Sequence, residues 1–289
     1  MTTVAQWIEG ARPRTLPAAL SPVLVGSGAA AAADGFRLSR AALALLVAVA
    51  LQIGVNYAND YSDGIRGTDA SRVGPLRLVG SGTTAPAAVK AAALLAFGIG
   101  ALAGLALALL TSFWLIPVGA AALAAAWGYT GGSRPYGYRG LGEVSVFVFF
   151  GLVAVLGTTY VQAGRLTLLA LGGGILNGAL ACAILVTNNL RDIPTDAQSG
   201  KQTLAVRLGA RRTRTLYVAL AAAPFVVLLA LAPAHPWVLI ALLAAPLALP
   251  PARLVRSGAV GPALIGVLRQ TARLQLVVGV LTTVGFALS

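Results

Sequence analysis

The residues of this chain that best suit metal and phosphate chemistry are acidic, and 289 residues contain only eight of them. Five fall in two short stretches that echo each other. One holds an amide and three carboxylates, and the other an amide and two carboxylates: Asn56, Asp60, Asp63 and Asp69, then Asn188, Asp192 and Asp196. In each stretch the amide precedes the first Asp by four residues, a spacing that places side chains on one helix face. Each stretch is therefore predicted to aim an amide and two carboxylates in one direction, provided that helix continues so far.

Clustered carboxylates repel one another and are costly near a membrane interior, so they indicate a bound cation. Mg²⁺ prefers oxygen ligands and commonly bridges carboxylates to substrate phosphates. Basic residues lie within or shortly after both stretches and suit a Mg²⁺–diphosphate complex: Arg66, Arg191, Lys201 and Arg207. The alternative is that the Asp residues only cap helices and solvate loops. The presence of two matching clusters in a chain with so few acidic residues argues against it. Pro194 predicts that the second helix breaks or restarts near Asp192.

The elements that carry these stretches are membrane spans. The chain is 58% hydrophobic and 10% charged, whereas soluble domains are about 25% charged. Apolar runs of about 20 residues indicate spans across a lipid bilayer. The sequence predicts nine spans in an all-α integral membrane bundle, at roughly 16–33, 41–60, 91–111, 114–130, 144–162, 168–190, 214–232, 237–251 and 272–288.

The distribution of positive charge predicts the orientation of the bundle. With the N-terminus in the cytoplasm, all but three of the 21 Lys and Arg residues fall on the cytoplasmic side, the exceptions being Arg37, Arg40 and Arg165. Cytoplasmic loops of membrane proteins carry this excess, so both Asp stretches are predicted to face the cytoplasm. The net charge of +13 is spread through loops between spans, which argues against nucleic acid as a partner.

Five segments of the chain resemble the UbiA-type membrane prenyltransferases, at residues 7–17, 56–69, 72–79, 129–143 and 188–209. Residues 129–143, with Tyr-Thr-Gly-Gly and Pro-Tyr-Gly-Tyr, are similar to the branch that prenylates 1,4-dihydroxy-2-naphthoate in menaquinone biosynthesis. The resemblance implies one domain over residues 1–289, in a bacterial-type inner membrane. It also implies a central cavity that opens sideways to lipid and is capped by cytoplasmic loops. Two pseudo-repeats are expected at roughly 16–130 and 144–251, followed by a last helix at 272–288.

The resemblance also implies a reaction. Mg²⁺ activates polyprenyl diphosphate, and the naphthoate ring attacks the allylic carbon with loss of CO₂ to give demethylmenaquinone. The implied metal site consists of Asp60, Asp63, Asp192 and Asp196, with help from Asn56 and Asn188. The second Asp of the first stretch stands at +3, where many members have +4, so either Asp63 or Asp69 completes that site.

Other residues are assigned by position. Arg72 and Arg77 lie in the loop after the first stretch and are predicted to contact diphosphate or the acceptor's carboxylate. Tyr136 and Tyr138 are predicted either to stabilise a developing cation or stack on the aromatic substrate, or to belong to an interfacial aromatic belt. The resemblance adds Arg12 as a possible substrate contact.

Three other functions fit parts of the pattern. A secondary transporter also has spans and intramembrane acids, but its site lies near the midplane rather than at helix ends. A phosphotransferase acting on CDP-alcohols keeps its Asp residues in one motif, whereas about 130 residues separate the two stretches here. Within the family, hydroxybenzoate, haem and chlorophyll prenylation remain alternatives.

Overall fold

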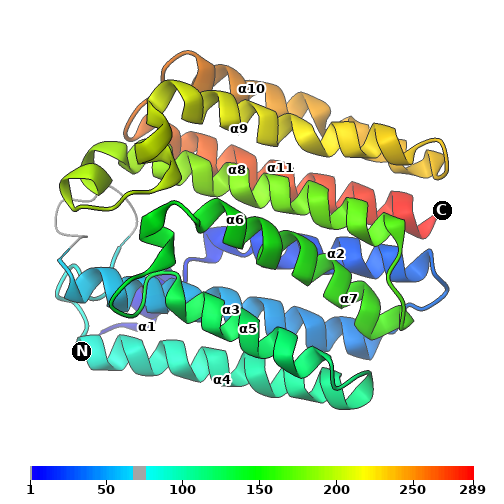
Figure 1. Cartoon of the computed structure of the whole chain (residues 1–289), viewed down its shortest axis with the longest axis horizontal. Coiled ribbons are helices and arrows are strands. Elements are labelled where there is room, and N and C mark those ends of the chain that lie inside the picture. The colour runs from blue at the N-terminus through cyan, green and yellow to red at the C-terminus, as the bar shows by residue number, and fades with distance from the viewer. Residues whose placement is uncertain (1, 68–75) are drawn as a thin grey trace.

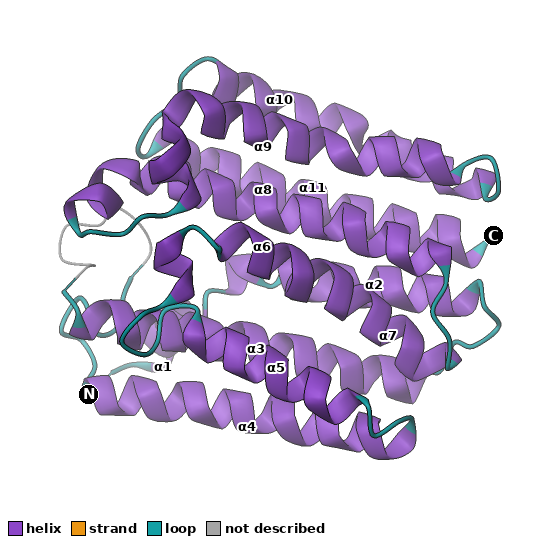
Figure 2. Ribbon diagram, in the orientation of Figure 1, coloured by secondary structure: helices purple, strands orange, loops and turns teal. Residues whose placement is uncertain are grey.

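A computed structural model describes residues 2–67 and 76–289, and every regular element within these ranges is helical (Figure 2). The all-α prediction is confirmed for this part of the chain. Two residues of the predicted site, Asp69 and Arg72, lie outside the described residues.

The helices run lengthwise beside one another, and the two termini lie at opposite ends of the bundle (Figure 1). In chain order the elements are α1 (Val4–Ala11), η1 (Pro13–Thr15), α2 (Pro17–Ala31), α3 (Leu38–Ile65), α4 (Pro86–Leu110), α5 (Leu115–Gly128), η2 (Tyr136–Arg139), α6 (Gly142–Val146), the π-helical η3 (Phe147–Val153), α7 (Ala154–Ala163), α8 (Leu168–Gln198), α9 (Leu204–Leu231), η4 (Pro236–Ala244), α10 (Ala245–Arg256) and α11 (Ala263–Ala287).

Seven segments in the described part of the chain are long and apolar enough to cross a membrane, so the protein is a multi-pass membrane protein. They are α3, α4, the continuous α6–η3–α7 segment, α8, α9, η4–α10 and α11. α2 and α5 are apolar but have only 15 and 14 residues. Their lengths of about 21–23 Å fall short of the roughly 30 Å hydrocarbon core.

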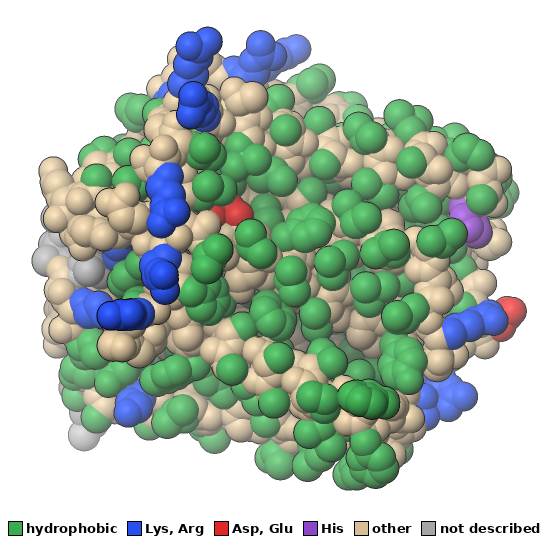
Figure 3. All heavy atoms as spheres, viewed as in Figure 1, with side chains coloured by type: hydrophobic (Ala, Val, Ile, Leu, Met, Phe, Trp, Pro, Cys, Tyr) green, Lys and Arg blue, Asp and Glu red, His purple; other side chains and the backbone are tan. Residues whose placement is uncertain are grey.

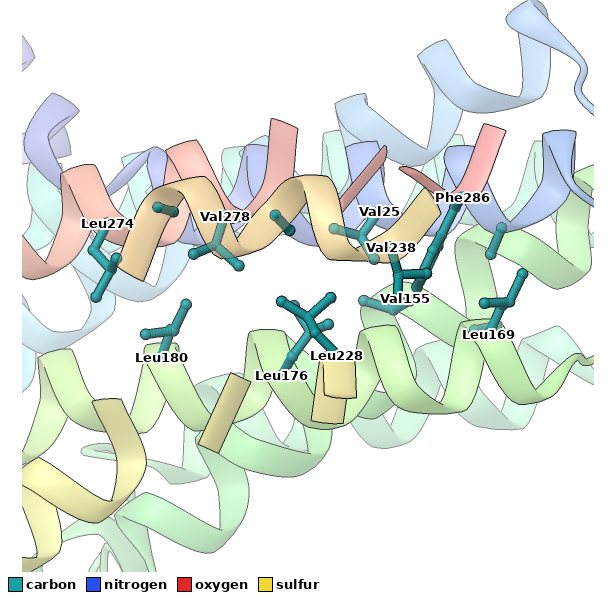
Figure 4. Packing of buried hydrophobic residues seen from close by; sticks show 14 residues of the cluster. Val25, Val155, Leu169, Leu176, Leu180, Leu228, Val238, Leu274, Val278 and Phe286 are labelled. Carbon is teal, nitrogen blue, oxygen red and sulfur yellow. The ribbon is translucent and has the colours of Figure 1, made fainter. Parts of the chain in front are cut away.

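Helix α8 is the centre of the bundle. Its apolar stretch is 78% buried, against 22–39% for the other six segments. Leu176 and Leu180 pack in a cluster with side chains from α2, α7, α9, η4 and α11 (Figure 4). α8 meets η3 at a glycine pair, where a Cβ on Gly151 would come within 2.5 Å of the Gly178 Cα. Small residues at such crossings let two helix backbones approach closely.

The two Asp stretches lie at one end of the bundle. α3 continues to Ile65 and therefore carries Asn56, Asp60 and Asp63 in one helix, as the spacing predicts. The predicted break at Pro194 is wrong, because α8 runs through it to Gln198. A proline removes one helical hydrogen bond, and the turns on either side keep the helix continuous here. Figure 3 shows most visible Lys and Arg side chains near this end.

Candidate active site

Asp60 holds the loop that follows α3. The carboxylate is fully buried, and its two oxygens accept hydrogen bonds from the backbone amides of Leu78 at 2.8 Å and Val79 at 3.0 Å. Leu78 is itself fully buried and packs against Tyr57. Asp60 was predicted to bind metal, and the structure gives it the partners of a loop anchor. Arg77 immediately precedes the anchored Leu78.

Asp63 connects the two Asp stretches. Its Oδ1 accepts hydrogen bonds from the Tyr138 hydroxyl and from Lys201 Nζ, the latter at 3.2 Å. The Lys201 ammonium also lies 4.5 Å from the centre of the Tyr138 ring, within the range of a cation–π contact. Lys201 follows α8, so this ion pair joins the end of α8 to the end of α3. Residues 138 positions apart thus meet at a buried carboxylate.

The second stretch neutralises part of its own charge. Arg191 makes a bidentate pair with Asp192, with Nε–Oδ1 at 2.7 Å and Nη2–Oδ2 at 2.8 Å. Their side chains are 4% and 10% exposed. Asp196 lies one turn further along α8 and is also buried. Arg191, which is predicted to contact diphosphate, has Asp192 as its partner in this structure.

The loop between α5 and α6 is hydrogen-bonded to the end of α3. Arg66 donates to the carbonyls of Thr130 and Gly132. The Thr130 hydroxyl donates to Asn59 Oδ1 at 2.7 Å. Arg207, another predicted diphosphate contact, is exposed and donates through Nε to the Gln202 carbonyl at 3.2 Å. These hydrogen bonds of the α5–α6 loop place Tyr138 beside Asp63, a contact that the sequence did not predict.

A cavity of about 370 Å³ begins beside these stretches and continues among the helices. Its polar end is lined by Arg12, Asn56 and Asn188. Its walls are otherwise mainly apolar and come from α2, α3, α4, α5, α6–η3–α7 and α8. Along α3 the cavity extends from Asn59 to Ala44, a distance of about 22 Å at the helical rise. The cavity therefore has a polar end, called its head below, and a long apolar part, called its tail.

Two buried polar atoms at the head of this cavity have no hydrogen-bond partner among the described residues. They are Arg12 Nη2 and Gln52 Oε1. Gln52 Nε2 donates to Thr15 Oγ1 at 3.0 Å, and Thr15 Oγ1 donates to the Arg12 carbonyl at 2.9 Å. Arg12 ends α1 in the left-handed region, with φ of 55°, which is uncommon for a residue with a side chain. Among the described residues, the polar end of the cavity thus offers one hydrogen-bond donor and one acceptor to a bound molecule.

Two tyrosines line the cavity between the α5–α6 loop and the apolar part of the cavity. The Tyr136 hydroxyl donates to the Ala125 carbonyl at 2.7 Å and lies 2.8 Å from Ser145 Oγ. Burial raises the pKa of this phenol, and the hydrogen bond with Ser145 opposes part of that shift. Tyr136 therefore stays neutral at physiological pH. Tyr129 packs edge-on against it at 5.6 Å. Tyr129, Gln52 and Thr15 are among the lining residues that the sequence analysis did not identify.

The carboxylates at this end suit a hard divalent cation by type, but those that the structure describes are not gathered into one ligand cluster. Within residues 2–67 and 76–289, no three His, Cys, Asp or Glu side chains are close enough to form a metal site. Asp63, Asp192 and Asp196 are all buried oxygen donors, the type that Mg²⁺ prefers. The ammonium of Lys201 already occupies one position beside Asp63, which shows that this site accepts positive charge.

The comparison with known families decides the identity of the fold. The sequence model of the UbiA prenyltransferase family matches residues 19–260. This chain belongs to that family. The sequence resemblance is thereby confirmed, and the transporter and phosphotransferase alternatives fall away.

Individual relatives agree with this placement. The chain is 59% identical over 277 residues to the 1,4-dihydroxy-2-naphthoate octaprenyltransferase of Mycobacterium tuberculosis, covering 96% of this chain and 95% of the relative. It is 38% identical to the Escherichia coli protein of the same name, covering 98% and 95%. A UbiA homologue from Archaeoglobus fulgidus, solved bound to GPP and Mg²⁺, shares the fold with a TM-score of 0.72 at 14% identity, covering 97% of this chain and 99% of that one.

Proposed function

We propose that this UbiA-family chain transfers a polyprenyl group from polyprenyl diphosphate to 1,4-dihydroxy-2-naphthoate with loss of CO₂, giving the quinol form of demethylmenaquinone. The observation that carries the proposal is the cavity, which joins a polar head at the two Asp stretches to an apolar tail. The names of relatives that are 59% and 38% identical over nearly the whole chain support the acceptor.

The donor's diphosphate is proposed to lie between the ends of α3 and α8. Asp63, Asp192 and Asp196 would hold Mg²⁺, with Asn56 and Asn188 as neighbouring amide ligands, and Asp69 remains the other candidate for the first stretch. Bound Mg²⁺ supplies charge neutralisation for the leaving diphosphate. Lys201 lies at the junction and contributes a further cation there. Basic side chains at this end of the bundle are the proposed further diphosphate contacts: Arg66, Arg72, Arg77, Arg191 and Arg207.

The acceptor is proposed to bind at the head of the cavity. Arg12 offers an unpartnered donor and Gln52 an unpartnered acceptor. This combination suits a ring that carries a carboxylate beside a hydroxyl group. Tyr129 and Tyr136 line the same space and supply aromatic faces for the ring and for positive charge on the allylic carbon.

The reaction balances without a strong base at the attacked carbon. The allylic C–O bond breaks, and its electron pair leaves with diphosphate. The ring carbon that bears the carboxylate forms the new C–C bond, with two ring oxygens supplying electron density. The bond to the carboxylate then breaks, its electrons restore the aromatic ring, and CO₂ departs. The only His, His235, lies between α9 and η4, outside the cavity lining.

In the membrane, we propose nine passes with the N-terminus and the Asp stretches in the cytoplasm of a bacterial-type inner membrane. α2 and α5 run alongside the seven long segments (Figure 1), so they complete the nine despite their length. The gathering of basic side chains at the end that carries Asp63 and Asp192 supports this orientation (Figure 3).

An acceptor labelled in its carboxylate carbon tests the proposed reaction. Membranes that contain the full chain are given Mg²⁺, polyprenyl diphosphate and labelled 1,4-dihydroxy-2-naphthoate. We expect labelled CO₂ to appear in step with prenylated product. Product that retains the label, or activity confined to 4-hydroxybenzoate, would contradict the proposed acceptor.

A further inference from the structure

A second pocket, of about 410 Å³, lies where the α5–α6 loop meets the α8–α9 loop. Three arginines line it: Arg134 and Arg139 come from the α5–α6 loop, and Arg207 comes from the start of α9. All three are exposed. The described lining of this pocket shares no residue with that of the central cavity. The arginine pocket is therefore a separate site at the same end of the bundle.

The arginine pocket carries positive charge that the described residues do not neutralise. No Asp or Glu is among its described lining, and the guanidinium groups of Arg134 and Arg139 make no hydrogen bond or ion pair with any described residue. Arg207 packs against Gly140, where a Cβ would come within 3.3 Å of its Nε, and that Nε donates to the Gln202 carbonyl. The two NH₂ groups of Arg207 remain available. Guanidinium groups bind phosphate oxygens in bidentate pairs, so the pocket suits a phosphate group.

The two loops that form the arginine pocket also meet at Asp63. The backbone amide of Gln202 donates to the Tyr138 carbonyl at 2.8 Å and joins the loops directly. The Tyr138 hydroxyl donates to Asp63 from the α5–α6 loop, and Lys201 donates to the same carboxylate from the α8–α9 loop. A phosphate bound between the loops would therefore hold together the two segments that reach Asp63.

The position of the pocket in the membrane favours a lipid as the source of the phosphate. Arg139 lies three residues before Gly142, the first residue of the membrane-spanning α6–η3–α7 segment. Leu141 and Val144, at the start of this segment, are 50% and 60% exposed. Basic pockets on the cytoplasmic side of membrane proteins bind anionic headgroups. A phospholipid can place its phosphate among the arginines and its acyl chains beside Leu141 and Val144, whereas a free phosphate compound uses only the arginines.

We propose that the arginine pocket binds the phosphate group of an anionic phospholipid between the α5–α6 and α8–α9 loops. This site is separate from the proposed prenyl transfer, and the inference does not depend on the donor or the acceptor. Arg207 is also among the proposed diphosphate contacts. The test therefore uses Arg134 and Arg139, which belong to the arginine pocket alone.

Hydrogen exchange locates the lipid on the full chain. The protein is studied in neutral detergent at about 0.15 M salt, which screens loose surface attraction, with phosphatidylglycerol or phosphatidylcholine added in equal mole fractions. Exchange is followed in peptides that cover residues 131–141 and 199–203. The pocket variant is Arg134→Gln/Arg139→Gln. The matched control is Arg253→Gln/Arg256→Gln, which removes the same charge from exposed positions in the last turn of α10, at the same end of the bundle (Figure 1).

We expect phosphatidylglycerol, but not phosphatidylcholine, to slow exchange in both peptides of the wild-type and control proteins. The pocket variant should need at least about tenfold more phosphatidylglycerol for half-maximal protection, equivalent to about 1.4 kcal/mol. Arg134→Lys/Arg139→Lys, which keeps the charge but not the planar fork, gives a smaller rise if the glutamine variant does not fold.

Four results would overturn the proposal. Phosphatidylglycerol gives no protection in the wild-type protein, or phosphatidylcholine protects equally well. The pocket variant keeps the wild-type midpoint, or the control variant loses protection to the same extent, which would indicate unspecific surface charge. A separate arm adds inorganic diphosphate without lipid. Protection of both peptides by diphosphate, lost in the pocket variant, would assign the arginine pocket to a free phosphate compound and also overturn the lipid proposal.

Discussion

The ends of α3 and α8 carry similar sequences but satisfy their carboxylates in different ways. At α3, the partners come from other segments: Asp60 binds the backbone of the following loop, and Asp63 binds Tyr138 and Lys201. At α8, Asp192 is paired with the adjacent Arg191. The α3 end therefore organises the loops around the site, whereas the bidentate pair at the α8 end neutralises charge within one helix.

This difference separates two roles of the carboxylates in an Asp motif, holding a loop and holding a cation. A carboxylate whose oxygens both accept backbone amides is committed to holding structure, because breaking those bonds leaves buried donors unsatisfied. A carboxylate that is paired with a flexible or adjacent side-chain cation can exchange that cation for a metal ion. On this basis Asp63 and Asp192 are better candidates for metal contact than Asp60, and the first three predictions below test that division.

The largest effect is expected at Asp63, where the α3 and α8 ends meet. Asp63→Asn removes the negative charge while keeping the shape, and we expect Mg²⁺-dependent prenyl transfer to fall by on the order of 10²-fold or more. Turnover is measured with labelled polyprenyl diphosphate at equal amounts of inserted protein. The comparison variant is Ser62→Ala, since Ser62 is the adjacent buried residue. Near-normal activity in Asp63→Asn would remove this residue from the reaction.

The next effect concerns the local pair at the α8 end. Arg191→Met keeps much of the side-chain volume but leaves Asp192 without its adjacent cation. Loss of one partner of a buried ion pair destabilises by about 3–5 kcal/mol, and partial exposure of Asp192 places the expected loss at the lower end, about 3 kcal/mol. Thermal unfolding in detergent gives the measurement. Arg191→Met/Asp192→Asn, which removes both charges, is expected to recover part of the loss. No recovery would show that the pair does not act as a unit.

A smaller effect is expected at Asp60. Asp60→Asn retains one carbonyl acceptor for two backbone amides, so one amide loses its partner, at about 1–3 kcal/mol. Limited proteolysis in the loop around Leu78 and Val79 is expected to accelerate, while the Mg²⁺ concentration that gives half-maximal activity stays unchanged. A large shift in that Mg²⁺ midpoint, with wild-type proteolysis, would make Asp60 a ligand and reverse the distinction drawn here.

Sequence reasoning succeeded where the signal was local and periodic. The spacing of Asn56, Asp60 and Asp63 predicted one continuous helix, and the structure confirms it. It failed at Pro194 because a rule about one missing hydrogen bond does not account for the surrounding helix. Contacts such as Lys201 with Asp63 depend on how α3 and α8 dock, which no spacing along the chain specifies.

The positions that line the cavity were hidden for a related reason. Gln52 lies one turn before Asn56 on α3, so the amide at that spacing was a usable signal. Tyr129 was within a segment already singled out for its resemblance. Gly119 and Gly157 also line the cavity, and a Cβ on either would meet no atom within 4 Å. They had no signal, because a glycine that leaves space and a glycine that packs closely look identical in sequence. Only the three-dimensional environment of each Cβ distinguishes them.

The smallest effect is expected at Tyr136, which lies in neither Asp stretch. Tyr136→Phe keeps the ring in the cavity and removes the hydroxyl that binds the Ala125 carbonyl and Ser145. We expect a stability loss of about 1 kcal/mol and a change in turnover within about fivefold, since the aromatic face remains. A loss as large as that of Asp63→Asn would instead place the hydroxyl in the chemistry.

The pH dependence of stability provides an independent check on Tyr136. Its folded-state pKa is raised above the ordinary value of 10.0, so the folded protein holds this proton more tightly than the unfolded chain does. The resulting stabilisation is complete below pH 10 and is lost as the pH rises through the folded-state pKa. Wild-type protein should therefore lose stability more steeply above pH 10 than Tyr136→Phe, which has no proton to release there. Unfolding followed by tryptophan fluorescence in detergent across this range measures the difference. Identical slopes would mean that burial does not raise the pKa of this phenol in the folded protein.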